Sequence, residues 1–100
     1  MKTVLLAYER EQDLATLTTL LESRGLRVHA AHSGVEALEV ARREAPHVLI
    51  SDVLLPKLDG FALCRRVHED PLLAHVPVLL HSFRIEATKF HKSRLAPLPR

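Results

Sequence analysis

The sequence predicts an α/β domain in which a doubly wound parallel sheet carries helices on both faces. Short apolar runs alternate with segments of helical periodicity along the 100 residues, and this alternation is typical of parallel strands joined by crossover helices. Three of the four apolar runs are apolar or small almost throughout, as expected of strands that are covered on both faces. The chain therefore resembles a layered sheet protein more than a helical bundle.

The first half of the chain contains two strand–helix pairs. Residues 4–7 form a continuous apolar run, and residues 11–24 follow with leucines at helical spacing before a terminating glycine. Residues 26–31 alternate apolar and polar side chains like a strand, and residues 35–45 return to helical spacing until a proline. We expect a strand, a helix, a strand and a helix over these ranges.

The second half continues the pattern. Residues 48–51 are predicted as the third strand, residues 60–69 as the third helix and residues 76–82 as the fourth strand. A fourth helix is expected from residue 84 to about residue 92. The end of the chain contains two prolines and no period, so residues 94–100 are predicted to form a flexible tail.

Composition favours one small domain over residues 1–93. The chain is 47% hydrophobic, its net charge is +2, and it has one cysteine. That balance of charge selects no class of partner, and nucleic acid is not expected as one despite the basic end of the chain. A single cysteine excludes an internal disulfide and fits a reducing compartment, and no apolar run approaches a membrane span of about 20 residues. We expect a cytoplasmic protein without a membrane contact.

Three polar residues lie at or just after the ends of predicted strands. Glu9 follows the first strand, Asp52 the third, and Ser82 ends the fourth. In open sheets of this type, ligands bind at the carboxyl ends of the strands. We expect Asp52 at the rim of the sheet, in contact with water rather than in the core.

The residues after the third strand carry a recognisable pattern, D-x-x-x-P-x-x-D-G, formed by Asp52, Pro56, Asp59 and Gly60. With the surrounding strand and helix, it resembles the receiver domain of two-component response regulators, over residues 2 to about 90. The resemblance implies the CheY-like (flavodoxin-like) three-layer fold with strand order 2-1-3-4-5. This chain is expected to lack the usual fifth strand and last helix. Asp59 is expected to be the N-cap of the third helix.

The resemblance also implies a site. Asp52 is expected to accept a phosphoryl group from a phosphohistidine on a sensor histidine kinase or phosphotransfer protein, and Ser82 to contact that group. Mg²⁺ would be held by Glu9, Asp52 and the backbone carbonyl of Leu54, because this ion requires oxygen ligands. The domain would then signal to a downstream protein target, and we do not expect it to be an enzyme.

Two departures from the family pattern weaken the predicted site. Tyr8 stands where the family has a second acid, and a neutral phenol is a poor Mg²⁺ ligand, so metal affinity should fall. The family's lysine after a fifth strand has no counterpart, because Lys89 and Lys92 fall in the expected fourth helix. A degenerate pseudo-receiver that binds partners without phosphorylation is the alternative. An enzyme of the doubly wound class lacks support because no nucleotide-binding fingerprint is present.

The fourth strand, the histidines, Cys64 and Tyr8 lead to further structural predictions. Without a fifth strand, the fourth strand would be an exposed apolar edge, which predicts a homodimer through that strand. Seven histidines are present, and Cys64 and His68 share a helical face, but a zinc site needs three or four converging ligands and we expect none. Cys64 is expected to pack in the core and His81 to point away from Ser82. Tyr8 either packs against Pro56 or covers the site.

Overall fold

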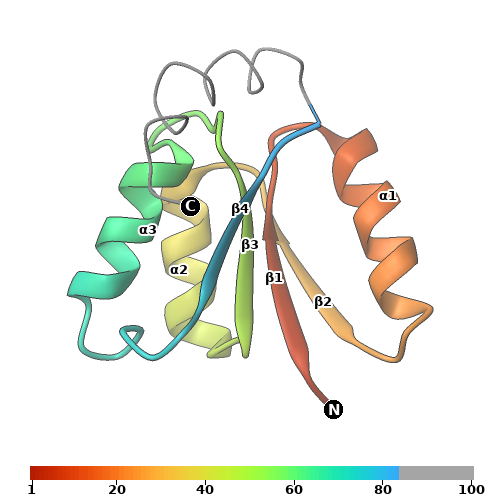
Figure 1. Cartoon of the computed structure of the whole chain (residues 1–100), viewed down its shortest axis with the longest axis horizontal. Helices are drawn as coiled ribbons and strands as arrows, with labels where there is room; N and C mark the ends of the chain where they lie inside the picture. Colours follow the sequence, from red (N-terminus) through yellow and green to blue (C-terminus); the bar gives the residue numbers. More distant parts are fainter. Residues whose placement is uncertain (84–100) are drawn as a thin grey trace, which may run out of the picture.

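Four parallel strands and three helices form the domain in the computed structural model, which describes residues 1–83. The strands stand in the order β2-β1-β3-β4, and Figure 1 shows the chain rising through each strand and returning through each helix. The strands are β1 (Thr3–Ala7), β2 (Arg27–Ala31), β3 (Val48–Asp52) and β4 (Val78–His81), and the helices are α1 (Glu11–Glu22), α2 (Gly34–Glu44) and α3 (Gly60–Glu69). The predicted doubly wound fold is confirmed for these elements.

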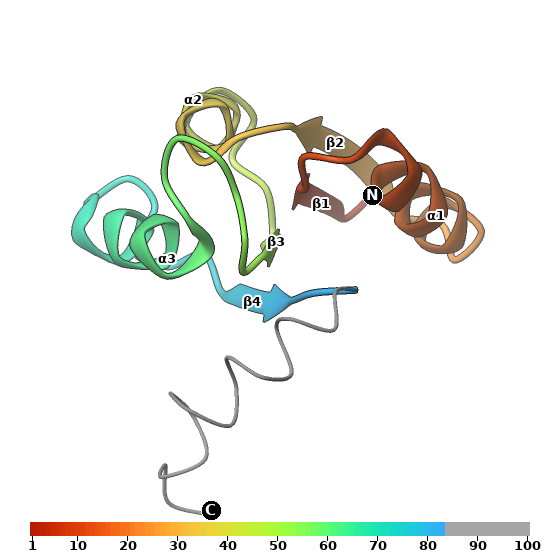
Figure 2. The same cartoon turned by 90° about the horizontal axis from the view of Figure 1, so that it is seen from above.

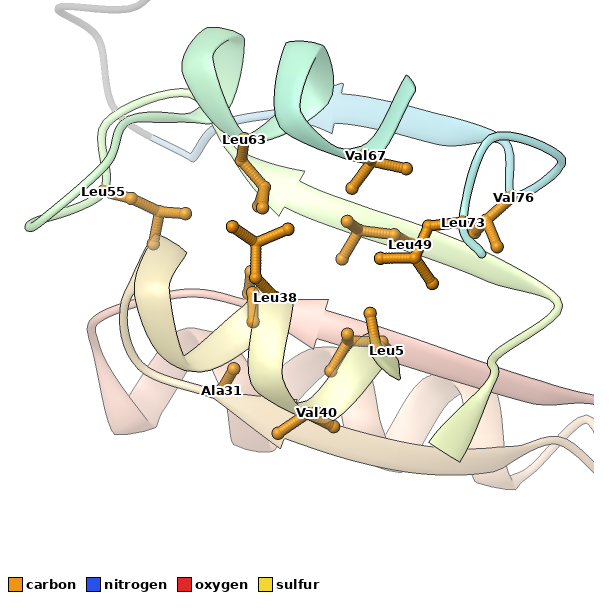
Figure 3. Close-up of a cluster of buried hydrophobic side chains, with 13 residues drawn as sticks. Leu5, Ala31, Leu38, Val40, Leu49, Leu55, Leu63, Val67, Leu73 and Val76 are labelled. Carbon is orange, nitrogen blue, oxygen red and sulfur yellow. The ribbon is translucent and has the colours of Figure 1, made fainter. Parts of the chain in front are cut away.

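The domain has three layers, with α1 on one face of the sheet and α2 and α3 on the other (Figure 2). Alternate residues of β1 supply both cores: Leu5 and Ala7 pack under α2 and α3, whereas Val4 and Leu6 pack under α1. Figure 3 shows the larger core, in which side chains from the sheet meet those of α2 and α3. Burial on both faces explains why β1 is apolar along most of its length.

Local sequence explains where the helices begin and end. The Ser33 hydroxyl accepts a hydrogen bond from the Glu36 N–H (3.1 Å) at the start of α2, and the Asp59 carboxylate accepts one from the Ala62 N–H (2.9 Å) at the start of α3. These are N-caps of the usual kind, so the prediction for Asp59 is confirmed. Gly25 follows α1 with a φ of 85°, the left-handed conformation that favours glycine.

Two predicted elements differ from the structure. The fourth strand begins at Val78 and not at residue 76, because Val76 is buried in the core ahead of the strand and Pro77 has no N–H to donate to a ladder. In the second strand the predicted alternation breaks down at its end, where Ala30 is exposed and Ala31 is fully buried. The predicted fourth helix and the predicted tail lie outside the described residues.

No helix within residues 1–83 has the length and apolar character needed to cross a membrane.

Candidate functional site

The carboxyl ends of β1, β3 and β4 meet at one edge of the sheet, shown at the top of Figure 1. The register pairs Ala7 with Ser51 on one side of β3, and Asp52 with His81 on the other. Tyr8, the residue after β1, therefore stands level with Asp52 and His81. Glu9 and Ser82 come one step further along the same edge, so the topology brings all three predicted site residues to this edge.

Asp52 is the last residue of β3 and is only 1% exposed. Asp52 lies at the edge of the sheet as expected, but the expectation that it contacts water was wrong, because its side chain is almost fully covered. Its Oδ1 accepts a hydrogen bond from the Leu54 N–H (3.2 Å), which partly satisfies the buried carboxylate. A buried carboxylate at the ligand-binding edge of an α/β sheet is unusual for a core residue and typical of a functional one.

The loop between β3 and α3 depends on Gly60 at its end. The Gly60 N–H donates to the Val53 carbonyl (3.0 Å), and a Cβ at position 60 would overlap the backbone of Asp52. Lys57 and Leu58 both have positive φ values, 60° and 137°, within this loop. Positive φ values are costly for residues other than glycine, so the surrounding structure must hold the loop in place.

Tyr8 is fully buried on the α1 face, in the cluster of Val4, Leu6 and Leu14. Its hydroxyl lies 2.7 Å from Nδ1 of His81. Burial raises the pKa of the Tyr8 hydroxyl, and the negative charges of Asp52 and Asp13 raise it further. The phenol therefore stays protonated and hydrogen-bonded to His81, which leaves it unsuited to bind a metal ion.

Glu9 is exposed and Ser82 is half-buried, and each makes an interaction of its own. The carboxylates of Glu9 and Asp52 are the two predicted acidic groups at this edge. No group of three His, Cys, Asp or Glu side chains is arranged to hold a metal within residues 1–83. The donor set suits a hard cation that completes its shell with backbone and water oxygens, as Mg²⁺ does.

Two smaller predictions have different outcomes. Cys64 is half-buried and its Sγ lies 3.9 Å from Nδ1 of His68, so the expectation that it packs in the core was wrong. It projects from the side of α3, whose buried positions are Gly60, Leu63 and Val67. Lys89 and Lys92 lie outside the described residues.

The family assignment comes from comparison with known proteins. The Response regulator receiver domain family matches residues 4–95. This chain belongs to that family. Receiver domains are signalling modules, so the edge described above is the candidate functional site of a receiver domain. The predicted CheY-like fold is confirmed.

Several proteins are similar to this receiver domain. The response regulator PleD of Caulobacter vibrioides is 34% identical over 77 residues, which is 77% of this chain and 17% of PleD. The polar-differentiation response regulator DivK of Brucella ovis is 30% identical over 78 residues, 78% of this chain and 63% of DivK. The chain thus matches less than two thirds of either relative. The crystal structure of the chemotaxis response regulator CheY4 of Vibrio cholerae superimposes with a TM-score of 0.77 and 26% identity, covering 93% of this chain and 79% of CheY4.

Sequence reasoning missed the group of three rings at this edge. Tyr8, His81 and Phe83 lie within 6.1 Å of one another by ring centroids, and His81 meets Phe83 edge to face at 4.6 Å. The spacing of two residues between His81 and Phe83, at the end of a strand, was a signal that both lie on one side. Tyr8, the residue after β1, joins them from a strand that only the sheet order places nearby.

Proposed function

We propose that this receiver domain accepts a phosphoryl group on Asp52. The observation that carries the proposal is the buried Asp52 carboxylate at the carboxyl edge of the sheet, within the family's D-x-x-x-P-x-x-D-G pattern. An Asp52 oxygen would attack phosphorus in line as the bond from phosphorus to the donor nitrogen or oxygen breaks, with the electron pair passing to the donor. Because Asp52 is almost wholly covered, the loops around it must open to admit the donor.

Mg²⁺ is the proposed cofactor, and Glu9, Asp52 and the Leu54 carbonyl are the proposed ligands. The ion would offset the negative charge that gathers on the transferring oxygens. Tyr8 leaves this site with one acid fewer than the family pattern, so we expect weaker binding of the ion than in receivers with two acids after β1. The Ser82 hydroxyl is proposed to donate to a phosphoryl oxygen.

The proposed partners are a sensor histidine kinase or phosphotransfer protein as donor, and a downstream protein as target. Support comes from membership of the receiver family and from the resemblance to response regulators. Cytoplasmic placement is proposed with them, because a phosphohistidine donor of this kind presents its group there.

The test uses acetyl phosphate with Mg²⁺ as a small phosphodonor. We expect the wild-type protein to gain the mass of one phosphoryl group, and Asp52→Asn, its nearly isosteric control, to gain none. Tyr8 is the one tyrosine of the chain and there is no tryptophan, so tyrosine emission reports directly on the surroundings of Tyr8 at this edge of the sheet. A wild-type protein that shows neither mass gain nor a Mg²⁺-dependent change of emission would overturn the proposal.

A pseudo-receiver is the second candidate, favoured by one observation. The Tyr8 hydroxyl is occupied by His81 and cannot replace the missing acid. In that case the domain would bind its target through its surface without phosphorylation, and Asp52→Asn would bind the target as the wild-type protein does.

Self-association is proposed through the outer edge of β4. Within residues 1–83 no strand pairs with that edge. Leu79 is 56% exposed and Phe83 48% exposed beside it. Unpaired apolar edge strands tend to pair with another chain.

A further inference from the structure

The three rings of Tyr8, His81 and Phe83, here called the aromatic clamp, join strands that do not pair with each other. Tyr8 follows β1 and His81 ends β4, whereas β3 stands between those two strands. The hydrogen bond between the Tyr8 hydroxyl and His81 Nδ1 therefore crosses over the end of β3. It connects the C-terminal end of β4 to the core under α1, where Tyr8 is buried.

The chemistry of the clamp explains why this hydrogen bond should form. A fully buried phenol needs a hydrogen-bond partner, because an unsatisfied buried hydroxyl is costly. Nδ1 of His81, 2.7 Å from the hydroxyl, is that partner. The edge-to-face contact between His81 and Phe83 further restrains the imidazole.

The clamp lies beside the last backbone bond between β3 and β4. The Val53 N–H donates to the His81 carbonyl at 3.2 Å, directly after Asp52 in the chain. Ser82 is the next residue after His81. Whatever fixes His81 therefore fixes both the end of the β3–β4 pair and the starting point of Ser82.

We propose that Tyr8 and His81 are a positioning pair. Their hydrogen bond fixes the C-terminal end of β4 relative to the end of β1, on the other side of β3, and so sets the position of Ser82 relative to Asp52. The role of Ser82 in this statement rests on the proposed function. The tie between the strands does not, because it concerns the free protein. Tyr8, which stands where the family pattern has a metal-binding acid, thus has a structural role in this receiver domain.

The first measurement is amide hydrogen exchange of the ligand-free protein by NMR. Tyr8→Phe keeps the buried ring and removes only the hydroxyl. We expect the Val53 amide to exchange roughly three- to tenfold faster in Tyr8→Phe, the range that a single net hydrogen bond supports. The Leu49 amide is the control, since it donates to Pro77 (3.0 Å) at the far end of the same strand pair and should keep its rate. Equal Val53 rates, or equal acceleration of both amides, would overturn the proposal.

The second measurement changes the acceptor. His81→Ala should accelerate Val53 exchange as Tyr8→Phe does, whereas in His81→Asn the side-chain oxygen can take the position of Nδ1 and should restore a slow rate. A His81→Asn protein that behaves like His81→Ala, together with a normal Tyr8→Phe, would show that the hydroxyl does not hold the strand.

The third measurement connects the pair to the site through beryllofluoride with Mg²⁺, a mimic of the phosphoryl group. If the wild-type protein binds it, Tyr8→Phe should bind roughly three- to tenfold more weakly, and unchanged affinity would overturn the positioning of Ser82. If the wild-type protein does not bind it, the proposed function fails, and the exchange rates still decide whether the clamp exists.

Discussion

Gly34, the first residue of α2, packs directly against the backbone of Leu58 in the loop that follows Asp52. Its N–H also donates to the carbonyl of Pro56 at 3.2 Å. The start of α2 therefore supports the loop that follows Asp52 from a neighbouring strand–helix unit. This contact accounts for a loop in which two residues other than glycine hold positive φ values.

A methyl group at position 34 should disturb that loop. Gly34→Ala would press a Cβ into the Leu58 carbonyl, and we expect a loss of about 1–3 kcal/mol in the free energy of unfolding. The measurement is denaturant unfolding, with Glu39→Ala, an exposed change on the same helix, as the control that should alter stability little. A Gly34→Ala protein as stable as the wild type would contradict the close packing.

The cap of α3 offers a second test. Asp59→Ala removes the acceptor of the Ala62 N–H and should cost about 1 kcal/mol of stability. Asp59→Ser keeps a capping oxygen and should stay within a few tenths of a kcal/mol of the wild type. Thermal unfolding of the three proteins compares them, and equal losses in both variants would mean that the carboxylate acts through something other than the cap.

Core packing predicts a larger effect. Leu63 is fully buried between α3 and the sheet (Figure 3), so Leu63→Ala should lose about 2–5 kcal/mol. Leu72, which is 71% exposed, provides the matched control, and Leu72→Ala should change stability by no more than about 0.5 kcal/mol. Similar losses from the two variants would show that the core does not lie where the structure places it.

His32 should make stability depend on pH. Its Nε2 lies 2.6 Å from Glu11 Oε2 and its Nδ1 lies 3.4 Å from Glu36 Oε1. The hydrogen bond with Glu11, followed by smaller contributions from its charge and from Glu36, raises the pKa of His32 above its ordinary value. A histidine with a raised folded-state pKa stabilises the fold below the unfolded pKa of about 6.5, and this contribution is lost as the pH rises through the folded-state pKa.

The measurement for His32 is denaturant unfolding from pH 5.5 to pH 8.5, a window of about one to two units on either side of the unfolded pKa. We expect His32→Gln to be less stable than the wild type at the acidic end and to approach it at the basic end. His75→Gln, at an exposed histidine of the α3–β4 connection, should not reproduce that convergence. A constant difference between wild type and His32→Gln across the range would count against the pair.

The proposed dimer is tested at β4. Leu79→Glu places a charge beside the outer edge of the sheet and should shift the protein toward monomer in light scattering. Leu20→Glu, at an equally exposed leucine on α1, should leave the association unchanged (Leu20 is 50% exposed and Leu79 56%). A wild-type protein that is monomeric at every accessible concentration would refute association through this edge.

Most of the fold could be predicted from the sequence. The alternation of strand and helix and the N-cap at Asp59 could be predicted because they are local signals, carried by residues that are neighbours in the sequence. The Ser33 cap was not predicted. The start of β4 was predicted less accurately, because Val76 is buried in the core although it lies before the strand. Apolar character alone does not distinguish a strand residue from a buried residue of a connecting segment.

Within the site, the residues were predictable and their surroundings were not. The sequence by itself determined the order of the elements, the membership of the receiver family, and the candidate residues Glu9, Asp52 and Ser82. Each candidate residue lies at or just after the end of a strand, and the strand ends meet at one edge of a parallel sheet. Only the tertiary structure decided that Asp52 is buried and that Tyr8 binds His81. The burial of Asp52 depends on how the sheet and the loop after β3 pack together. The Tyr8–His81 contact joins segments far apart in the chain, which no spacing of neighbouring residues can express.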